Sequence, residues 1–150
     1  MPLDASTTPV SAPTEPTPRA VTVLVADPHP GLRAALAVAL ATQAGIAVVG
    51  SAGRLEDAVA ALRRQRPDVI LLDLAVLAEC GVAQLAELAA VRRSTAVLVM
   101  GVVEDAVRTR HVIRAGAAGH VMKHAPAEEL AAAVRSAARR ARRLRLADPR

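Results

Sequence analysis

The sequence predicts a doubly wound α/β fold, in which five helices cover both faces of a five-stranded parallel sheet. Five short apolar runs alternate with five segments in which Leu, Val and Ala recur at helical spacing. The run Val69–Leu72 is apolar without interruption, as expected of a strand buried on both faces of a parallel sheet. With 150 residues and a hydrophobic content of 53%, the chain is long enough for one domain with a substantial core.

The expected strands are the apolar runs themselves: Val21–Ala26, Ile46–Gly50, Val69–Leu74, Ala96–Met100 and Gly119–Met122. The expected helices follow them in turn: Gly31–Gln43, Leu55–Gln65, Val82–Arg93, Asp105–Ala115 and 126–143. In the first three helices the expected inward positions are Leu32, Leu36, Leu40, Leu55, Val59, Leu62, Leu85 and Leu88. Gly45 and Gly116 are expected to end the first and fourth helices. Pro126 opens the last helix, and the acids Glu128 and Glu129 suit its positive end.

The chain ends differ in composition from the segment between them. Residues 1–19 hold five of the ten Pro together with Ser and Thr, which predicts a disordered tail. Residues 20–143 are expected to form the domain, and residues 144–150 a basic tail or linker remnant. Residues 135–150 carry seven Arg and one acid, so the basic charge belongs to this end rather than to the whole domain.

Composition excludes several classes of protein. Phe, Tyr and Trp are absent, so the chain has no aromatic platform for single-stranded nucleic acid. The single Cys80 excludes an internal disulfide and argues against a zinc site. No apolar run approaches the roughly 18 residues that span a membrane. The N-terminus lacks the features of a signal peptide, so we expect a cytoplasmic protein.

Three polar residues follow expected strands and are candidates for one site. Asp27 follows the first strand, Asp73 ends the third apolar run and Lys123 follows the fifth. Ligands of such sheets bind at the carboxyl ends of the strands, and two carboxylates with one ammonium suit Mg²⁺ and a phosphoryl group. Lys123 is informative because every other basic residue of the Lys/Arg type is Arg. The alternatives are that Asp73 caps the next helix and that Lys123 forms a structural ion pair with one Asp.

Three segments together resemble the receiver domain of bacterial two-component response regulators, in the branch that usually carries a C-terminal helix-turn-helix. They are residues 23–30, 67–74 and 114–123, and the resemblance extends over about 21–143. It implies a flavodoxin-like sheet with strand order 2-1-3-4-5. It also implies a role in phosphorelay signal transduction rather than catalysis of a metabolic reaction. The implied partners are a sensor histidine kinase or another signalling protein, with a homodimer as a further option.

The resemblance also implies roles for the site residues. Asp73 matches the aspartate that is phosphorylated. Asp27, Asp73 and the backbone carbonyl of Ala75 match the ligands of Mg²⁺, and Lys123 matches the catalytic lysine that contacts the acyl phosphate. These roles are chemically coherent because a metal ion and an ammonium both offset the charge of an incoming phosphoryl group.

The sequence departs from the family pattern at three single positions and in the segment 77–80, where the family usually has a Pro and a Gly-containing turn. Pro28 stands where the family usually has a second acid, so Mg²⁺ binding is expected to be weak or absent. Gly101 stands where the family has Thr or Ser at the end of the fourth strand, so the switch hydroxyl is missing. His120 replaces the switch aromatic of the fifth strand and is interpreted as a solvated side chain, with a pH-sensitive group as the alternative. His29, just past the first strand, is interpreted as a family feature rather than a metal ligand.

Two readings of an atypical receiver follow from these departures. In the first, Asp73 is still phosphorylated, slowly. In the second, which the lost positions favour, the domain is a docking or dimerisation module that works without phosphorylation. Two other functions remain open: a flavodoxin-like domain that binds a small molecule or nucleotide, and a DNA-associated regulator that uses the Arg-rich end. The small-molecule or nucleotide function is weakened because the chain lacks a Gly-rich phosphate loop after the first strand. The DNA-associated function rests on the basic tail alone, so nucleic acid is an unexpected partner for this chain.

Overall fold

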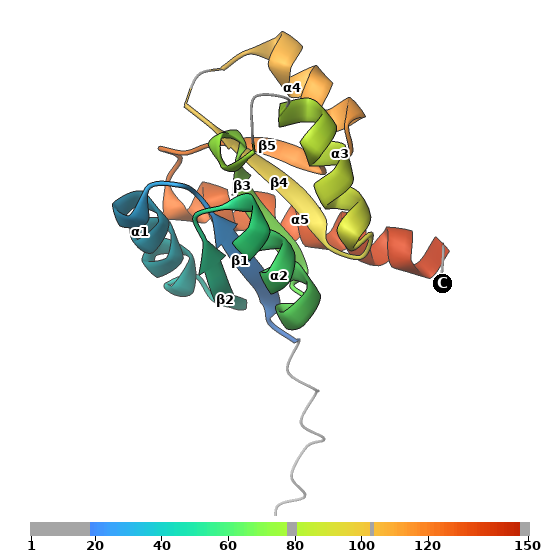
Figure 1. The fold of residues 1–150 in the computed structure, drawn as a ribbon. Helices are drawn as coiled ribbons and strands as arrows, with labels where there is room; N and C mark the ends of the chain where they lie inside the picture. Colours follow the sequence, from blue (N-terminus) through green and yellow to red (C-terminus); the bar gives the residue numbers. More distant parts are fainter. Residues whose placement is uncertain (1–18, 78–80, 103, 148–150) are drawn as a thin grey trace, which may run out of the picture.

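A computed structural model of the chain describes residues 19–77, 81–102 and 104–147. Five parallel strands form one sheet in the order β2-β1-β3-β4-β5 (Figure 1). The strands are β1 Val21–Ala26, β2 Ile46–Ala52, β3 Val69–Asp73, β4 Ala96–Gly101 and β5 Gly119–Met122. The helices are α1 Pro30–Ala41, α2 Leu55–Gln65, α3 Gly81–Val91, α4 Ala106–Arg114 and α5 Ala127–Ala147, with a short 3₁₀ turn, η1, over Leu74–Val76. The predicted fold class and strand order are confirmed.

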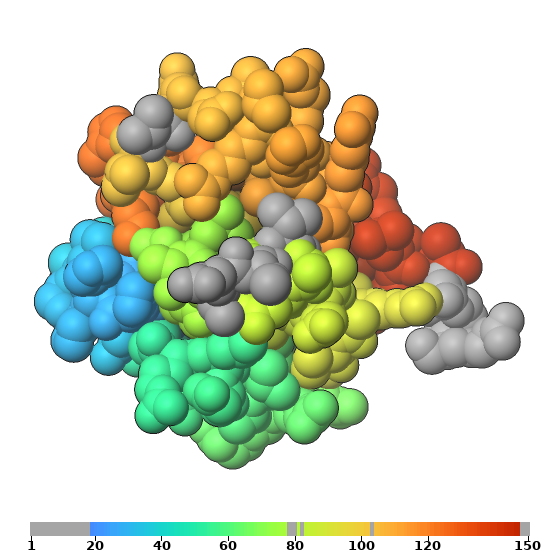
Figure 2. All heavy atoms as spheres, turned by 45° about the horizontal axis from the view of Figure 1, so that its top comes forward, coloured from blue at the N-terminus to red at the C-terminus, as the bar shows by residue number. Residues whose placement is uncertain are grey.

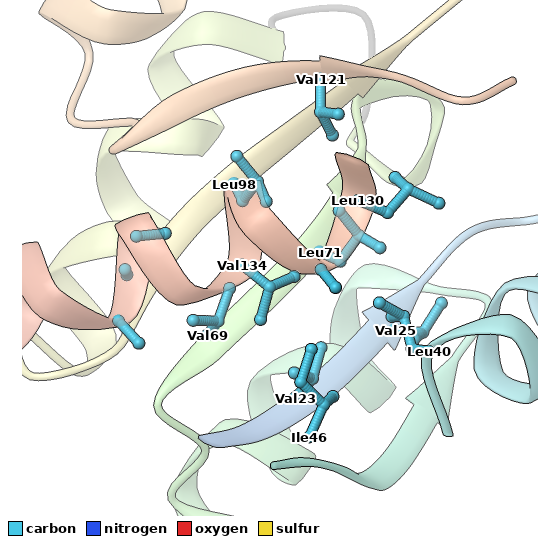
Figure 3. Close-up of a cluster of buried hydrophobic side chains, with 14 of the residues drawn as sticks. Val23, Val25, Leu40, Ile46, Val69, Leu71, Leu98, Val121, Leu130 and Val134 are labelled. Atoms are coloured by element: carbon cyan, nitrogen blue, oxygen red, sulfur yellow. The ribbon is translucent and has the colours of Figure 1, made fainter. Parts of the chain in front are cut away.

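Each face of the sheet has its own hydrophobic core because successive side chains of a strand point to opposite sides. On one face Val23, Val25 and Leu71 pack with buried residues of α1 and α5 (Figure 3). On the other face Leu24 and Leu72 pack with buried residues of α2, α3 and α4. The central strands are therefore buried on both sides, which explains why their sequences are apolar without alternation.

Several element boundaries differ from the sequence prediction. The last helix continues to Ala147, beyond the expected end near Arg143, because no Gly or Pro interrupts the sequence and Leu, Arg and Ala all favour helix, although residues 142–147 are exposed. Residues 144–147 are thus helical. The expected tail over residues 1–19 lies outside the described residues except for its last member, Arg19.

Asp68 links the first and last segments of the described chain. Its buried carboxylate accepts hydrogen bonds from the backbone N–H of Thr22 at 2.9 Å and from the Thr22 hydroxyl at 3.1 Å. It also pairs with Arg19 at 3.2 Å and with Arg145 at 3.6 Å. Burial alone would raise the pKa of Asp68, but the Thr22 hydrogen bonds and the charge of Arg19 outweigh it, and the pKa lies below its ordinary value.

Glycine and aspartate residues mark the ends of two helices. Gly45 and Gly116 have positive φ angles of 76° and 117°, which confirms that glycine marks the turns after α1 and α4. Asp105 accepts hydrogen bonds from the N–H groups of Val107 and Arg108 and so caps the start of α4. None of the helices in the described ranges combines the length and the apolar character that crossing a bilayer requires.

Candidate functional site

The sheet order brings the three predicted site residues to one edge. β1 and β3 are neighbours, with Ala26 opposite Leu72, so Asp27 and the final β3 residue Asp73 lie side by side. Lys123 follows β5, two strands away from β3. Its long side chain spans the distance to the two carboxylates. In Figure 1 this edge is marked by the loop into α1, by η1 and by the orange loop that follows β5; Figure 2 turns this side forward, with α4 above and α2 below.

Lys123 pairs with both carboxylates. Its Nζ lies 2.7 Å from Oδ2 of Asp27 and also pairs with Oδ2 of Asp73. The three side chains are nearly enclosed, with exposed fractions of 0% for Asp27, 10% for Lys123 and 14% for Asp73. The alternative of an ion pair with one Asp is therefore too simple, since the ammonium bridges two acids from different strands.

Asp27 is held by the turn that follows β1. Its Oδ1 accepts the backbone N–H of His29 at 2.8 Å and lies 3.2 Å from the His29 Nδ1. Its backbone carbonyl accepts a hydrogen bond from Arg33 at 2.7 Å. Oδ2 faces Lys123, whose ammonium is its one polar partner among the described residues. One oxygen is thus used by the backbone and the other faces the site.

Asp73 divides its oxygens in the same way. Oδ1 accepts the N–H of Ala75 at 2.8 Å, which caps the 3₁₀ turn η1, while Oδ2 faces Lys123. The predicted strand therefore ends at Asp73 rather than Leu74. The two interpretations of Asp73, a cap and a site residue, apply to different oxygens of one carboxylate.

The ion pairs oppose the effect of burial on the charges. Burial alone would raise the pKa of Asp27, but Lys123 and the His29 N–H outweigh it, and the pKa lies below its ordinary value. Burial alone would lower the pKa of Lys123, but its hydrogen bonds with Asp27 and Asp73 and their charges raise it above the ordinary value. Both groups are therefore charged at neutral pH.

The same edge offers donor atoms for a metal ion. One atom each from Asp27, His29 and Asp73 lie within 4.8 Å of one another. Two carboxylate oxygens fit Mg²⁺, which prefers oxygen ligands and retains several waters. The sequence interpretation of His29 as a family feature missed that its ring lies beside Asp27. A His two residues after a site acid was the available signal.

A pocket of about 300 Å³ opens between the sheet and α4. The residues that line it include Asp73, Gly101, Arg108, His120 and Lys123. His120 is half-buried in this wall, so its interpretation as a solvated side chain is wrong. Burial and the charge of Arg108 lower the pKa of His120, although Glu104 opposes them.

Gly101 and His120 are in direct contact, which sequence reasoning did not reveal. A Cβ built on Gly101 would lie 2.5 Å from Nε2 and 3.0 Å from Cε1 of the His120 ring. The first distance is shorter than real Cβ atoms show and the second is tight, so a side chain at position 101 would require the imidazole to move. The two substitutions are complementary in shape.

A larger cavity, of about 510 Å³, lies at the opposite edge of the sheet, where Thr95, Ala96 and Ala118 line it. Arg93, Arg140 and Arg145 also line it, beyond α3 and within the last turns of α5. Cations at these places offset the negative ends of the helix dipoles, and Arg145 already pairs with Asp68. The arginines here thus have a structural explanation. The candidate site residues Asp27, Asp73 and Lys123 lie at the other edge of the sheet.

Comparison with known proteins shows the family. The family model of the response regulator receiver domain matches residues 23–135. Oxygen regulatory protein NreC of Staphylococcus aureus is 30% identical over 115 residues, which make up 76% of this chain and 53% of NreC. The signal receiver domain of response regulator NarL from Mycobacterium tuberculosis has a TM-score of 0.71 and 30% identity, covering 81% of this chain and 98% of that domain. The response regulator domain of CheB from Thermotoga maritima has a TM-score of 0.70 and 27% identity, with the same coverage of 81% and 98%.

The chain therefore belongs to the response regulator receiver domains of two-component signalling. It spans about half the length of the curated relatives it matches.

Proposed function

We propose that the chain is an atypical receiver domain that takes up a phosphoryl group on Asp73 and signals through contacts with other proteins. The observation that carries this proposal is the Lys123 ammonium, which pairs with both Asp27 and Asp73 on the wall of a pocket. A purely structural pair would need only one of these acids. The double contact supports the first of the two readings of the sequence, in which Asp73 retains its reactivity.

The site residues divide the work of phosphoryl transfer. The Ala75 N–H holds Oδ1 of Asp73 and so orients the carboxylate, with Oδ2 toward Lys123. A carboxylate oxygen forms a bond to phosphorus while the bond between phosphorus and the donor's leaving group breaks, which produces an acyl phosphate. Lys123 offsets the negative charge of the phosphoryl oxygens, at a site that excludes most of the water.

Asp27 and Asp73 would hold Mg²⁺, with the Ala75 carbonyl as the third protein ligand that the family resemblance implies. When bound, this cation supplies charge neutralisation for the phosphoryl group. Pro28 has no carboxylate to add, so we expect Mg²⁺ to bind more weakly than in a receiver with two adjacent acids. The His29 ring is the one further donor that the described residues place in this cluster.

The proposed partners are a sensor histidine kinase or another cytoplasmic signalling protein, and a second copy of the chain is a further option. Val102 lines the site pocket and is 68% exposed, and Val107 at the start of α4 is 53% exposed. These apolar side chains beside the site favour the second candidate function, a docking module that binds partners without phosphorylation. The same surface would serve both functions.

The test is the intact mass of the protein after incubation with acetyl phosphate and Mg²⁺. We expect the addition of one phosphoryl group to the wild type and none to an Asp73→Asn variant. An unchanged mass of wild-type protein, shown by circular dichroism to be folded, would contradict phosphorylation by small donors and favour the docking function. Incubation without Mg²⁺ is the control for the metal.

A further inference from the structure

We propose that His120 donates a hydrogen bond to the phosphoryl group on Asp73, and that Gly101 is the residue that makes room for it. This inference rests on the proposed function, because it needs a phosphoryl group at Asp73. It assigns a positive role to two residues that, taken separately, look like losses. The group concerned is the Nε2–H of a neutral imidazole.

The strand register places the two residues on one face. Gly101 lies opposite Met122, and His120 lies opposite Val99, so the alternation of the strands puts Gly101 and His120 on the same side of the sheet. This is the side that carries Val99 and the buried Val112 of α4. His120 is therefore a diagonal neighbour of Gly101 across the β4–β5 pair.

The ring reaches across this diagonal with its polar end. Nε2 is the His120 atom nearest to the position that a Cβ of residue 101 would occupy, at 2.5 Å. A side chain at the end of β4 would start from that position. The imidazole nitrogen therefore stands where such a side chain would present its own polar group to the pocket.

The pocket leaves few other side-chain donors for a phosphoryl oxygen. None of the described residues that line it is Ser, Thr or Tyr, and its cationic side chains are Lys123 and Arg108. Lys123 already serves two carboxylates. A neutral ring that donates from Nε2 adds a hydrogen bond without adding a charge next to Lys123. Hydrogen bonds to charged acceptors are stronger than those between neutral groups.

The experiment measures the rate at which acetyl phosphate phosphorylates Asp73 in a set of folded variants. We expect His120→Ala to slow phosphorylation about 10- to 100-fold, the loss that corresponds to one hydrogen bond to a charged group. His120→Gln keeps an N–H donor and should retain most of the rate. His111→Ala, on the exposed surface of α4, is the matched control and should leave the rate unchanged.

A second pair of variants tests the role of Gly101. Gly101→Ala should displace the ring and slow the reaction as His120→Ala does, but should add nothing in the His120→Ala background. Gly101→Ser in that background should restore part of the rate, because a hydroxyl returns to the pocket. A structural role for His120 would predict no rescue by Ser. In ¹⁵N spectra, the Nε2 signal of His120 should shift on phosphorylation.

The outcomes separate this inference from the proposed function. If the wild type takes up a phosphoryl group and His120→Ala does so at the same rate, the inference is wrong and the proposed function stands. If the folded wild type takes up none, both are overturned. A rate loss in His120→Ala that neither Gln nor Gly101→Ser recovers would also overturn the donor role.

Discussion

Removal of the Lys123 ammonium should destabilise the domain strongly at neutral pH. In a Lys123→Met variant the side chain keeps a similar length but loses its charge. Asp27 is fully buried, and among the described residues this ammonium is the one polar partner of its Oδ2. An unpaired buried charge of this kind costs about 3–5 kcal/mol of unfolding free energy. The second acid, Asp73, adds repulsion once the ammonium between them has gone.

The loss should depend on pH in a defined direction. In the wild type the pKa of Asp27 lies below its ordinary value, so its contribution to stability is present above that value and is lost as the pH falls. In the variant, burial without an ion pair raises the pKa of Asp27, so stability is instead lost as the pH rises. The difference between the two proteins should therefore be larger at pH 7 than near pH 4.

Urea denaturation in the presence of EDTA, followed by circular dichroism at several pH values, measures this difference. Asp27→Asn combined with Lys123→Met is the matched control and should recover part of the lost stability, because the fully buried charge of Asp27 is gone and only the partly exposed Asp73 stays charged. A loss below about 1 kcal/mol at pH 7, or a loss that does not change with pH, would refute the reasoning that Asp27 and Lys123 form a buried, coupled pair.

Three further predictions concern the core, the opposite edge and the metal. Leu71→Ala should cost about 2–5 kcal/mol because Leu71 is fully buried, whereas Val38→Ala on the exposed face of α1 should stay within about 0.5 kcal/mol; urea denaturation of both decides it. Asp68→Asn should lower the free energy of unfolding by about 1–3 kcal/mol at pH 7 and by less below pH 3.8, where the Asp68 carboxylate of the wild type also begins to be protonated. An equal loss at pH 7 and below pH 3.8 would contradict the lowered pKa of Asp68. Mg²⁺ at a concentration equal to its dissociation constant should stabilise the wild type by about 0.4 kcal/mol, and Asp27→Asn should abolish this; an equal rise in melting temperature for both proteins would exclude Asp27 as a ligand.

The sequence by itself determined the elements of the fold and the location of the candidate site. Apolar runs such as Val69–Leu72 identify strands because burial on both faces leaves no polar positions. Polar residues at the ends of parallel strands converge because these strands share one carboxyl edge, so the sequence alone groups Asp27, Asp73 and Lys123. Each of these patterns involves residues that are close together in the sequence, so it can be recognised without a structure.

Only the tertiary structure decided how these residues share their contacts. Gly101 and His120 lie on two different strands, and His120 Nε2 is 2.5 Å from the position that a Cβ of residue 101 would occupy, a closeness that no spacing in the sequence encodes. The pairing of Arg145 with Asp68 depends in the same way on where α5 crosses the sheet. Side-chain volume and charge are satisfied by neighbours in space, and those neighbours are separated along the chain by whole elements of secondary structure.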